Sequence, residues 1–218
     1  MTDATGTSTT AIPVRGMAPT LRSPLAPTHA ALGAVLGLEE GAEFVRSYAD
    51  PDRERAALGE HVGLADITVR AKIDLRGATG TAGGNGFAIA EGWTLLLLPP
   101  GPVADRVAEL QTATGDAGMV TDVTHLYAGF ALAGPALFDV VSRLTSWDPS
   151  TLAVGQATGA PIADVRAIVV RREAAVPLME VYVAMEFARY VWRSIIEEAE
   201  PLGGCPVGWD VLRDRGWR

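Results

Sequence analysis

The sequence has one cysteine, no long apolar run and an excess of acidic over basic residues. A lone cysteine, Cys205, cannot form an internal disulfide and is typical of a reducing cytoplasm. The longest apolar run, at 93–98, is far shorter than the ~20 residues of a membrane-spanning helix. The formal net charge of −8 argues against duplex nucleic acid or an anionic membrane as the partner. We therefore expect a cytoplasmic protein.

Motifs that would assign a reaction are also missing. The sequence contains no nucleophile elbow, Walker loop or dinucleotide-binding fingerprint. The three histidines, His29, His61 and His125, are not spaced like metal ligands, and no zinc site is expected. The glycine cluster at 80–84 lacks the strand–helix context of a phosphate-binding loop, so it indicates a flexible loop.

What remains is typical of a folded globular protein. Of the 218 residues, 48% are hydrophobic and 20% are charged, which is enough for a sizeable core. Residues 1–21 are rich in Thr, Ala, Ser and Pro and lack the features of a signal peptide, so we expect a disordered tail and an extended leader there. Residues 22–218 are expected to form the folded domain.

Alternating strand and helix patterns predict an α+β fold. Asp50-Pro51 is typical of a helix start and predicts a helix over 51–61. Apolar residues at 69, 71, 73 and 75 alternate with charged residues at 70, 72, 74 and 76, which predicts one long strand over 64–75 with a single buried face. Further strands are expected at 87–90, 93–98, 119–123, 127–132, 161–171 and 177–183, and helices at 103–114, 135–144, 186–200 and 206–213.

One pattern occurs twice. Residues 71–77 and 128–134 each place an alternating strand before a glycine. This fits two related strand–helix units, expected at about 22–117 and 118–218, but such joints are common and the repetition is equally compatible with chance.

Several short motifs follow one another in an order that resembles the aminomethyltransferase superfamily. This group includes the glycine cleavage T protein, the folate domains of dimethylglycine and sarcosine dehydrogenases, and the gamma subunit of heterotetrameric sarcosine oxidase. The motifs are Ser23-Pro24-Leu25, His29, Gly63–Thr68, Arg76-Gly77, Val120–Thr124, Phe130–Pro135, Glu180–Val183 and Pro206–Arg213. The resemblance implies two split β-α-β (ferredoxin-like) units in the aminomethyltransferase folate-binding fold, without the C-terminal β-barrel.

The resemblance also implies a folate site, which this sequence matches only in part. It places cofactor-binding residues at Glu180, Tyr182, Trp209 and Arg213, with tetrahydrofolate as the expected cofactor. The aspartate that such relatives carry in the hairpin after the first strand has no counterpart at 78–90. Their Gly-Tyr-Thr-Gly-Glu stretch is likewise absent. In its compact layout the chain is most similar to the sarcosine oxidase gamma subunit.

Each candidate residue has a plain alternative. For Glu180 a strand carboxylate that faces solvent or an arginine such as Arg171 is slightly favoured over a folate contact, because a single carboxylate without its companion residues binds little. Asp66 and Thr68 are better explained by a turn at a strand entry, and Cys205 by packing. The tryptophans at 209 and 217 lie where the absent barrel would pack, and they predict an uncovered apolar face for a protein partner.

These observations favour one function and leave a second open. The leading hypothesis is a non-catalytic or weakly catalytic subunit of a flavin-dependent amine oxidase or demethylase complex in one-carbon metabolism. Its partners would be a flavoprotein oxidase or a folate-domain subunit. The alternative is a minimal tetrahydrofolate-dependent one-carbon transferase, with Asp66, Asp122 or Glu180 near the reacting nitrogen.

Overall fold

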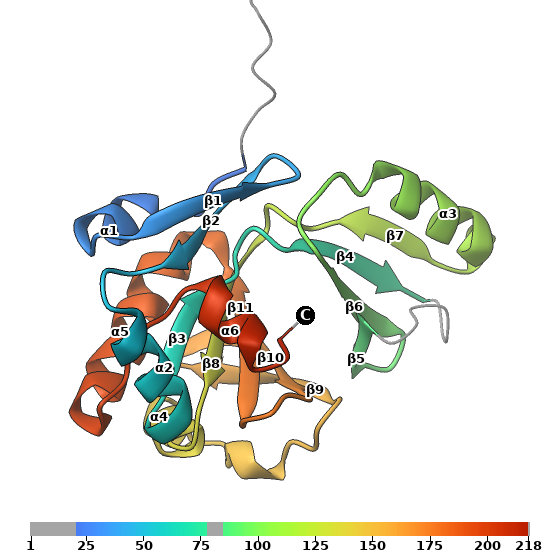
Figure 1. Ribbon diagram of the computed structural model, residues 1–218. Coiled ribbons are helices and arrows are strands. Elements are labelled where there is room, and N and C mark those ends of the chain that lie inside the picture. Colours follow the sequence, from blue (N-terminus) through green and yellow to red (C-terminus); the bar gives the residue numbers. More distant parts are fainter. Residues whose placement is uncertain (1–20, 78–84, 218) are drawn as a thin grey trace, which may run out of the picture.

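The computed structural model describes residues 21–77 and 85–217 (Figure 1). The tail expected at the N-terminus falls almost wholly outside these ranges, and so does the glycine cluster at 80–84. No described helix is long and apolar enough to cross a membrane.

The described chain forms three sheets and six α-helices around them. A six-stranded sheet has the order β12-β3-β8-β11-β10-β9, a four-stranded sheet has the order β5-β6-β4-β7, and β1 and β2 form a hairpin. The strands are β1 (Val35–Glu39), β2 (Ala42–Ser47), β3 (Gly63–Asp66), β4 (Ala71–Arg76), β5 (Gly86–Ala90), β6 (Trp93–Leu98), β7 (Met119–Asp122), β8 (Tyr127–Ala133), β9 (Ala157–Ile162), β10 (Val165–Arg172), β11 (Leu178–Ala184) and β12 (Cys205–Pro206). The helices are α1 (Ala26–Ala31), α2 (Pro51–Glu60), α3 (Ala104–Thr114), α4 (Leu137–Leu144), α5 (Ala188–Ala199) and α6 (Trp209–Asp214).

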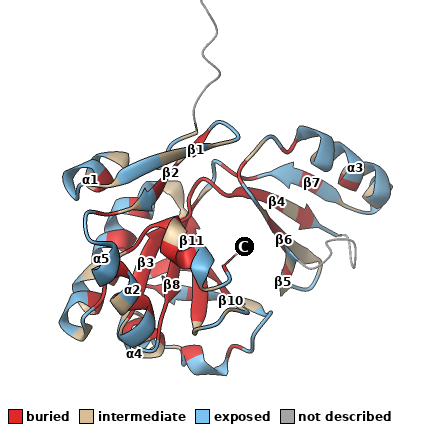
Figure 2. Cartoon of the chain, viewed as in Figure 1, coloured by how far each residue is buried: buried red, intermediate tan, exposed pale blue. Residues whose placement is uncertain are grey.

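Three apolar clusters hold these layers together. The first packs α4 and α5 against one face of the six-stranded sheet. The second fills the opposite face of that sheet and includes α2, α6 and residues of β5 and β6. The third joins the four-stranded sheet to α3. Figure 2 shows the buried residues concentrated in the large sheet, with an exposed outer surface on α3. The second cluster brings both sheets and the C-terminal segment together, and it contains the candidate site.

The mixed α+β class is confirmed, as are most of the expected elements. The helices expected at 51–61, 103–114 and 186–200 are present within one to two residues at their ends. The hairpin at 87–98 turns at Gly92, whose φ of +65° suits a residue without Cβ. The hairpin of β1 and β2 was not expected from the sequence.

The prediction of a single strand over 64–75 is wrong, because this segment forms two strands, β3 and β4. The chain makes a turn after β3, where Arg70 N–H donates to Ile67 O at 3.1 Å, and then enters β4 in a different sheet. Both faces of this segment are covered, so Arg70 and Lys72 are buried instead of facing solvent. The strand expected at 161–171 also divides, at Ala163 and Asp164, which both have positive φ.

Candidate functional site

Glu180 is fully buried in β11, and its carboxylate is bound on both oxygens by the same chain. Arg70 Nη1 and Trp217 Nε1 donate to Glu180 Oε1 at 2.8 and 2.7 Å. The Tyr182 hydroxyl donates to Oε2 at 2.9 Å, and Arg172 Nε lies 3.8 Å from Oε1. A ligand that approached Glu180 would therefore have to displace Arg70 or Trp217.

Local geometry explains how these groups meet. Glu180 and Tyr182 are two residues apart in a strand and share one face. The turn after β3 directs Arg70 to the same place, where Arg70 Nε donates to Leu98 O at 3.3 Å and its guanidinium lies 5.1 Å from the Trp217 ring centroid. Burial and the nearby charge of Glu180 raise the pKa of Tyr182 well above its ordinary value, so Tyr182 acts as a donor.

A hollow of about 360 Å³ lies beside this cluster. Arg213 borders it and is held by Glu39 at 2.7 Å, with its guanidinium 5.1 Å from the Trp209 ring centroid. Trp209 is buried, and its Nε1 donates to Asp66 O at 2.7 Å. The residues that line the hollow are Glu39, Arg70, Pro99, Pro100, Trp209, Arg213 and Trp217.

The structure thus places the four residues predicted from the resemblance in two linked positions. Trp209 and Arg213 line the hollow, while Glu180 and Tyr182 form a hydrogen-bonded pair that does not line it. Of the two simpler alternatives for Glu180, exposure to solvent is wrong, whereas pairing with an arginine is confirmed, with Arg70 in place of Arg171. Arg70 and Trp217 were not singled out as partners of Glu180. Arg70 sits in a pattern that favoured an exposed side chain, and Trp217 lies far away in sequence.

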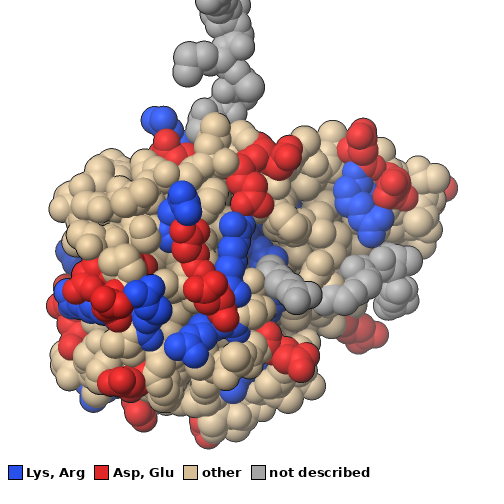
Figure 3. Space-filling view, viewed as in Figure 1, with Lys and Arg blue, Asp and Glu red and all other residues tan. Residues whose placement is uncertain are grey.

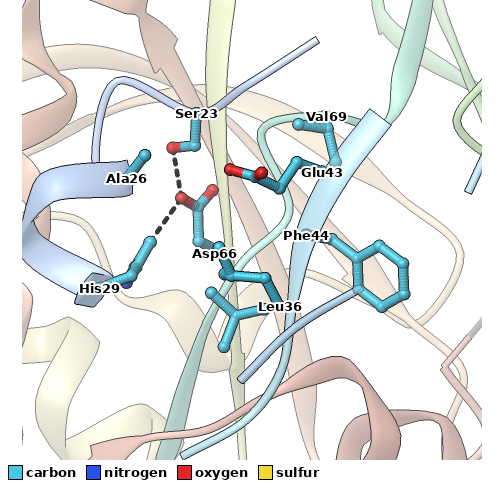
Figure 4. A pocket seen from close by; sticks show the side chains of 9 residues that line it. Ser23, Ala26, His29, Leu36, Glu43, Phe44, Asp66 and Val69 are labelled. Carbon is cyan, nitrogen blue, oxygen red and sulfur yellow. Dashed lines mark hydrogen bonds and ion pairs between the residues drawn. The ribbon is translucent and has the colours of Figure 1, made fainter. Parts of the chain in front are cut away.

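A second buried cluster surrounds Asp66 (Figure 4). Asp66 Oδ2 accepts a hydrogen bond from Ser23 Oγ and lies 2.8 Å from His29 Nε2. His29 Nδ1 is 2.9 Å from the Tyr48 hydroxyl. Asp66 Oδ1 accepts from Thr68 N at 2.9 Å, which confirms the expected turn. Sequence reasoning missed the convergence of Ser23, His29 and Asp66, although all three lie in the motifs that carry the resemblance.

The second cluster holds two parts of the chain together and is not arranged as a nucleophilic centre. Burial raises the pKa of Asp66, but the hydrogen bond and charge of His29, together with the bonds from Ser23 and Thr68, outweigh burial and leave that pKa lowered. The carboxylate stands between Ser23 and His29, so the imidazole is not placed to take the hydroxyl proton. The adjoining cavity of about 20 Å³ is too small for a substrate. The cluster fastens α1 and its leader to β3.

Lys72 lies between the two clusters and is completely buried. Its Nζ donates to Thr68 O at 2.7 Å and to Arg70 O at 2.8 Å, with Thr124 O at 3.5 Å. Burial, followed by the charge of Arg70, lowers the pKa of Lys72 to about 7. These contacts fix the turn that carries Arg70 toward Glu180.

The remaining expectations have mixed outcomes. Cys205 is a packing residue, and burial raises the pKa of its thiol. The expectation of an uncovered apolar face around Trp209 and Trp217 is wrong, because both side chains are at most 5% exposed. Among the described residues no group of three potential ligands could hold a metal ion.

Comparisons with known proteins place this arrangement among known folds. No protein-family model and no curated protein matches the chain. Among solved structures it resembles the glycine cleavage system aminomethyltransferase T of Bartonella henselae, with a TM-score of 0.72 and 18% identity over 89% of this chain. The chain spans 61% of the length of that protein. It also resembles heterotetrameric sarcosine oxidase of Corynebacterium sp. U-96, in complex with pyrrole 2-carboxylate, with a TM-score of 0.61 and 18% identity over 84% of this chain and 97% of that one. The chain therefore has an aminomethyltransferase-like fold.

Proposed function

We propose that this protein is a non-catalytic or weakly catalytic cytoplasmic subunit of a flavin-dependent amine oxidase or demethylase complex in one-carbon metabolism. In such a complex it would complete the assembly and close off a channel for a formaldehyde-level or iminium intermediate. The split ferredoxin-like arrangement of two halves belongs to the same proposal.

The state of Glu180 carries the proposal. The sequence resemblance implies that the matching glutamate of the folate-using relatives binds the pterin ring. Here Oε1 accepts from Arg70 and Trp217 and Oε2 accepts from Tyr182, so Glu180 does not present two unoccupied oxygens to an aminopyrimidine edge. Residues 78–90 contain no aspartate either. A chain with the fold in which this carboxylate is held by its own side chains is better suited to a supporting role than to one-carbon transfer.

The comparison with sarcosine oxidase adds support. The matched chain is covered over 97% of its length, so it is close to this one in size, and it comes from a heterotetramer. A folded domain of this size can serve as a subunit without an active site of its own.

Affinity purification from the native cell tests the proposal. We expect the tagged protein to recover a second polypeptide with flavin absorbance near 450 nm in a fixed ratio. Amine-dependent oxygen or dye reduction should fall when the tagged gene is deleted. Recovery of the chain alone, with amine oxidation unchanged in the deletion strain, would remove the hypothesis.

One observation keeps the tetrahydrofolate-dependent transferase open as a second candidate. The hollow next to the Glu180 cluster is lined by Trp209 and Arg213, two of the residues that the resemblance assigns to the cofactor. Titration of tetrahydrofolate by calorimetry tests this reading. Micromolar binding that is weakened about tenfold in both Arg213→Met and Glu180→Gln would support it. No heat of binding would exclude it.

A further inference from the structure

A second and larger cleft lies between the four-stranded and the six-stranded sheet. Glu180, Trp209 and Arg213 do not line it. Its volume is about 470 Å³, which is in the range of small-molecule sites. The residues that line it are Arg76, Trp93, Leu126, Tyr127, Gly159, Val165, Arg166, Ala167, Ile168, Tyr182, Ala184 and Phe187.

The floor and one rim of the cleft are apolar. Ile168 and Tyr182 face each other in the register of β10 and β11 and form the floor. Leu126 and Phe187 line the rim and remain 51% and 42% exposed. Exposed apolar side chains that gather beside a concave surface are typical of ligand-binding grooves. The cleft can therefore accommodate a flat apolar group of a ligand.

The opposite wall holds an arginine in a fixed position. Arg76 and Trp93 pair across β4 and β6, and the Arg76 guanidinium lies 3.9 Å from the Trp93 ring centroid. Arg76 Nε donates to Asp74 Oδ2 at 2.8 Å, and Trp93 Nε1 donates to the other oxygen of Asp74. Asp74 binds the Nε group of Arg76, and Trp93 lies against its guanidinium. No described residue forms a hydrogen bond with the terminal nitrogens of Arg76, so these can bind a ligand.

A second arginine stands across from the first. Arg166 is exposed in β10, two residues before Ile168 and on the same face. The described part of the chain places no carboxylate within ion-pair distance of it. Tyr127 lines the cleft together with both arginines, and burial, followed by the charge of Asp74, raises the pKa of its hydroxyl.

We propose that this cleft binds a planar aromatic carboxylate, with its ring against Trp93, Ile168 and Phe187 and its carboxylate between Arg76 and Arg166. Guanidinium groups bind carboxylates through paired hydrogen bonds. Because Asp74 offsets one of the two positive charges, the cleft has a surplus of about one and suits a monoanion. This inference does not rest on the proposed subunit role.

Binding of 2-naphthoate and of its neutral analogue 2-naphthamide tests the inference, read by calorimetry and by tryptophan fluorescence. We expect saturable binding of the acid and binding of the amide that is about tenfold weaker. Arg166→Met should weaken the acid about tenfold and leave the amide unchanged, and since Arg166 is exposed the variant should fold normally. Phe187→Ala should weaken both probes.

Arg106→Met is the control for Arg166→Met, because Arg106 is also a surface arginine and lies on α3, outside the residues that line the cleft. Arg213→Met, in the other hollow, should also leave binding unchanged. Absence of saturable binding of 2-naphthoate would overturn the proposal. Equal affinity for acid and amide, or an equal loss in Arg166→Met and Arg106→Met, would overturn it as well.

Discussion

Ionised side chains in the interior are held in two different ways. Arg70 and Glu180 neutralise each other, and Trp217 and Tyr182 satisfy the remaining oxygen sites. The Lys72 ammonium group donates to backbone carbonyls and pairs with no carboxylate among the described residues, and burial lowers its pKa instead. Burying a charge is costly without a partner of opposite sign, so these residues are where substitution should reveal most.

Lys72 should give stability an unusual pH dependence. With a pKa of about 7 in the folded state and ~10.4 in the unfolded state, the unfolded chain binds more protons across this window. The free energy of unfolding should therefore rise from pH 7 to pH 10, by an amount on the order of 4 kcal/mol. In Lys72→Met this rise should disappear from urea unfolding curves recorded over the same range.

The pKa itself can be measured directly, because Lys72 is the only lysine in the sequence. Labelling with [13C]lysine yields one Cε resonance from this residue, whose titration midpoint we expect near 7. A midpoint above 10 would contradict the buried position of the ammonium group.

The Arg70–Glu180 pair should show strong coupling. Arg70→Met leaves Glu180 buried with Arg172 at 3.8 Å as its closest cation, and should cost about 3 kcal/mol of unfolding free energy. The double variant Arg70→Met/Glu180→Gln should cost less than the sum of the single changes, because the uncompensated charge is gone. Urea unfolding of all four species measures the coupling. Arg106→Met serves as the surface reference and should cost below about 1 kcal/mol. Additive losses would show that the pair does not act as a unit.

Strands with mainly apolar residues, such as β8 and β11, are predictable from sequence although both of their faces are covered, whereas the alternating segment of β3 and β4 is not. The α2 helix followed from Asp50, whose side chain accepts from Arg53 N, and the β5–β6 hairpin followed from Gly92. Across β3 and β4, the alternation of charged and apolar residues indicated an exposed face, but a second sheet and the C-terminal segment cover that face. Periodicity cannot reveal a covering layer that is distant in sequence. For the same reason Glu180 was identified without Arg70 and Trp217.

The junction between β2 and α6 depends on a glycine. A Cβ on Gly208 would lie 2.0 Å from Arg46 O and 2.5 Å from Ser47 N, and Gly208 N donates to the buried Glu54 at 2.7 Å. Gly208→Ala should therefore lower the unfolding free energy by about 2 kcal/mol or more and the melting temperature by roughly 5–8 °C. Gly159→Ala is the control, since a Cβ there meets nothing within 4 Å. Equal melting temperatures for the two variants would contradict the close approach seen here.

At the scale of the whole molecule, the two halves expected from the sequence exchange strands. Strand β3 from the first half pairs with β8 and β12 from the second, while β7 from the second half pairs with β4 from the first. The charge pair Arg70–Glu180 also joins the halves. Figure 3 shows acidic and basic side chains interspersed over the visible face that both halves form.

This exchange predicts that neither half folds alone. A fragment of residues 22–117 would leave β3 without its neighbouring strands and Arg70 without the carboxylate of Glu180. A fragment of residues 118–218 would leave β7 without β4 and Glu180 without the guanidinium of Arg70. Each should show poor dispersion of amide signals in NMR spectra and no cooperative urea transition, whereas residues 22–218 should unfold in one step. Mixing the fragments should restore some dispersion, because the missing strands and charges then become available. A sigmoidal transition from either fragment alone would show that its sheet is stable without the exchanged strand, and that the halves are independent folding units.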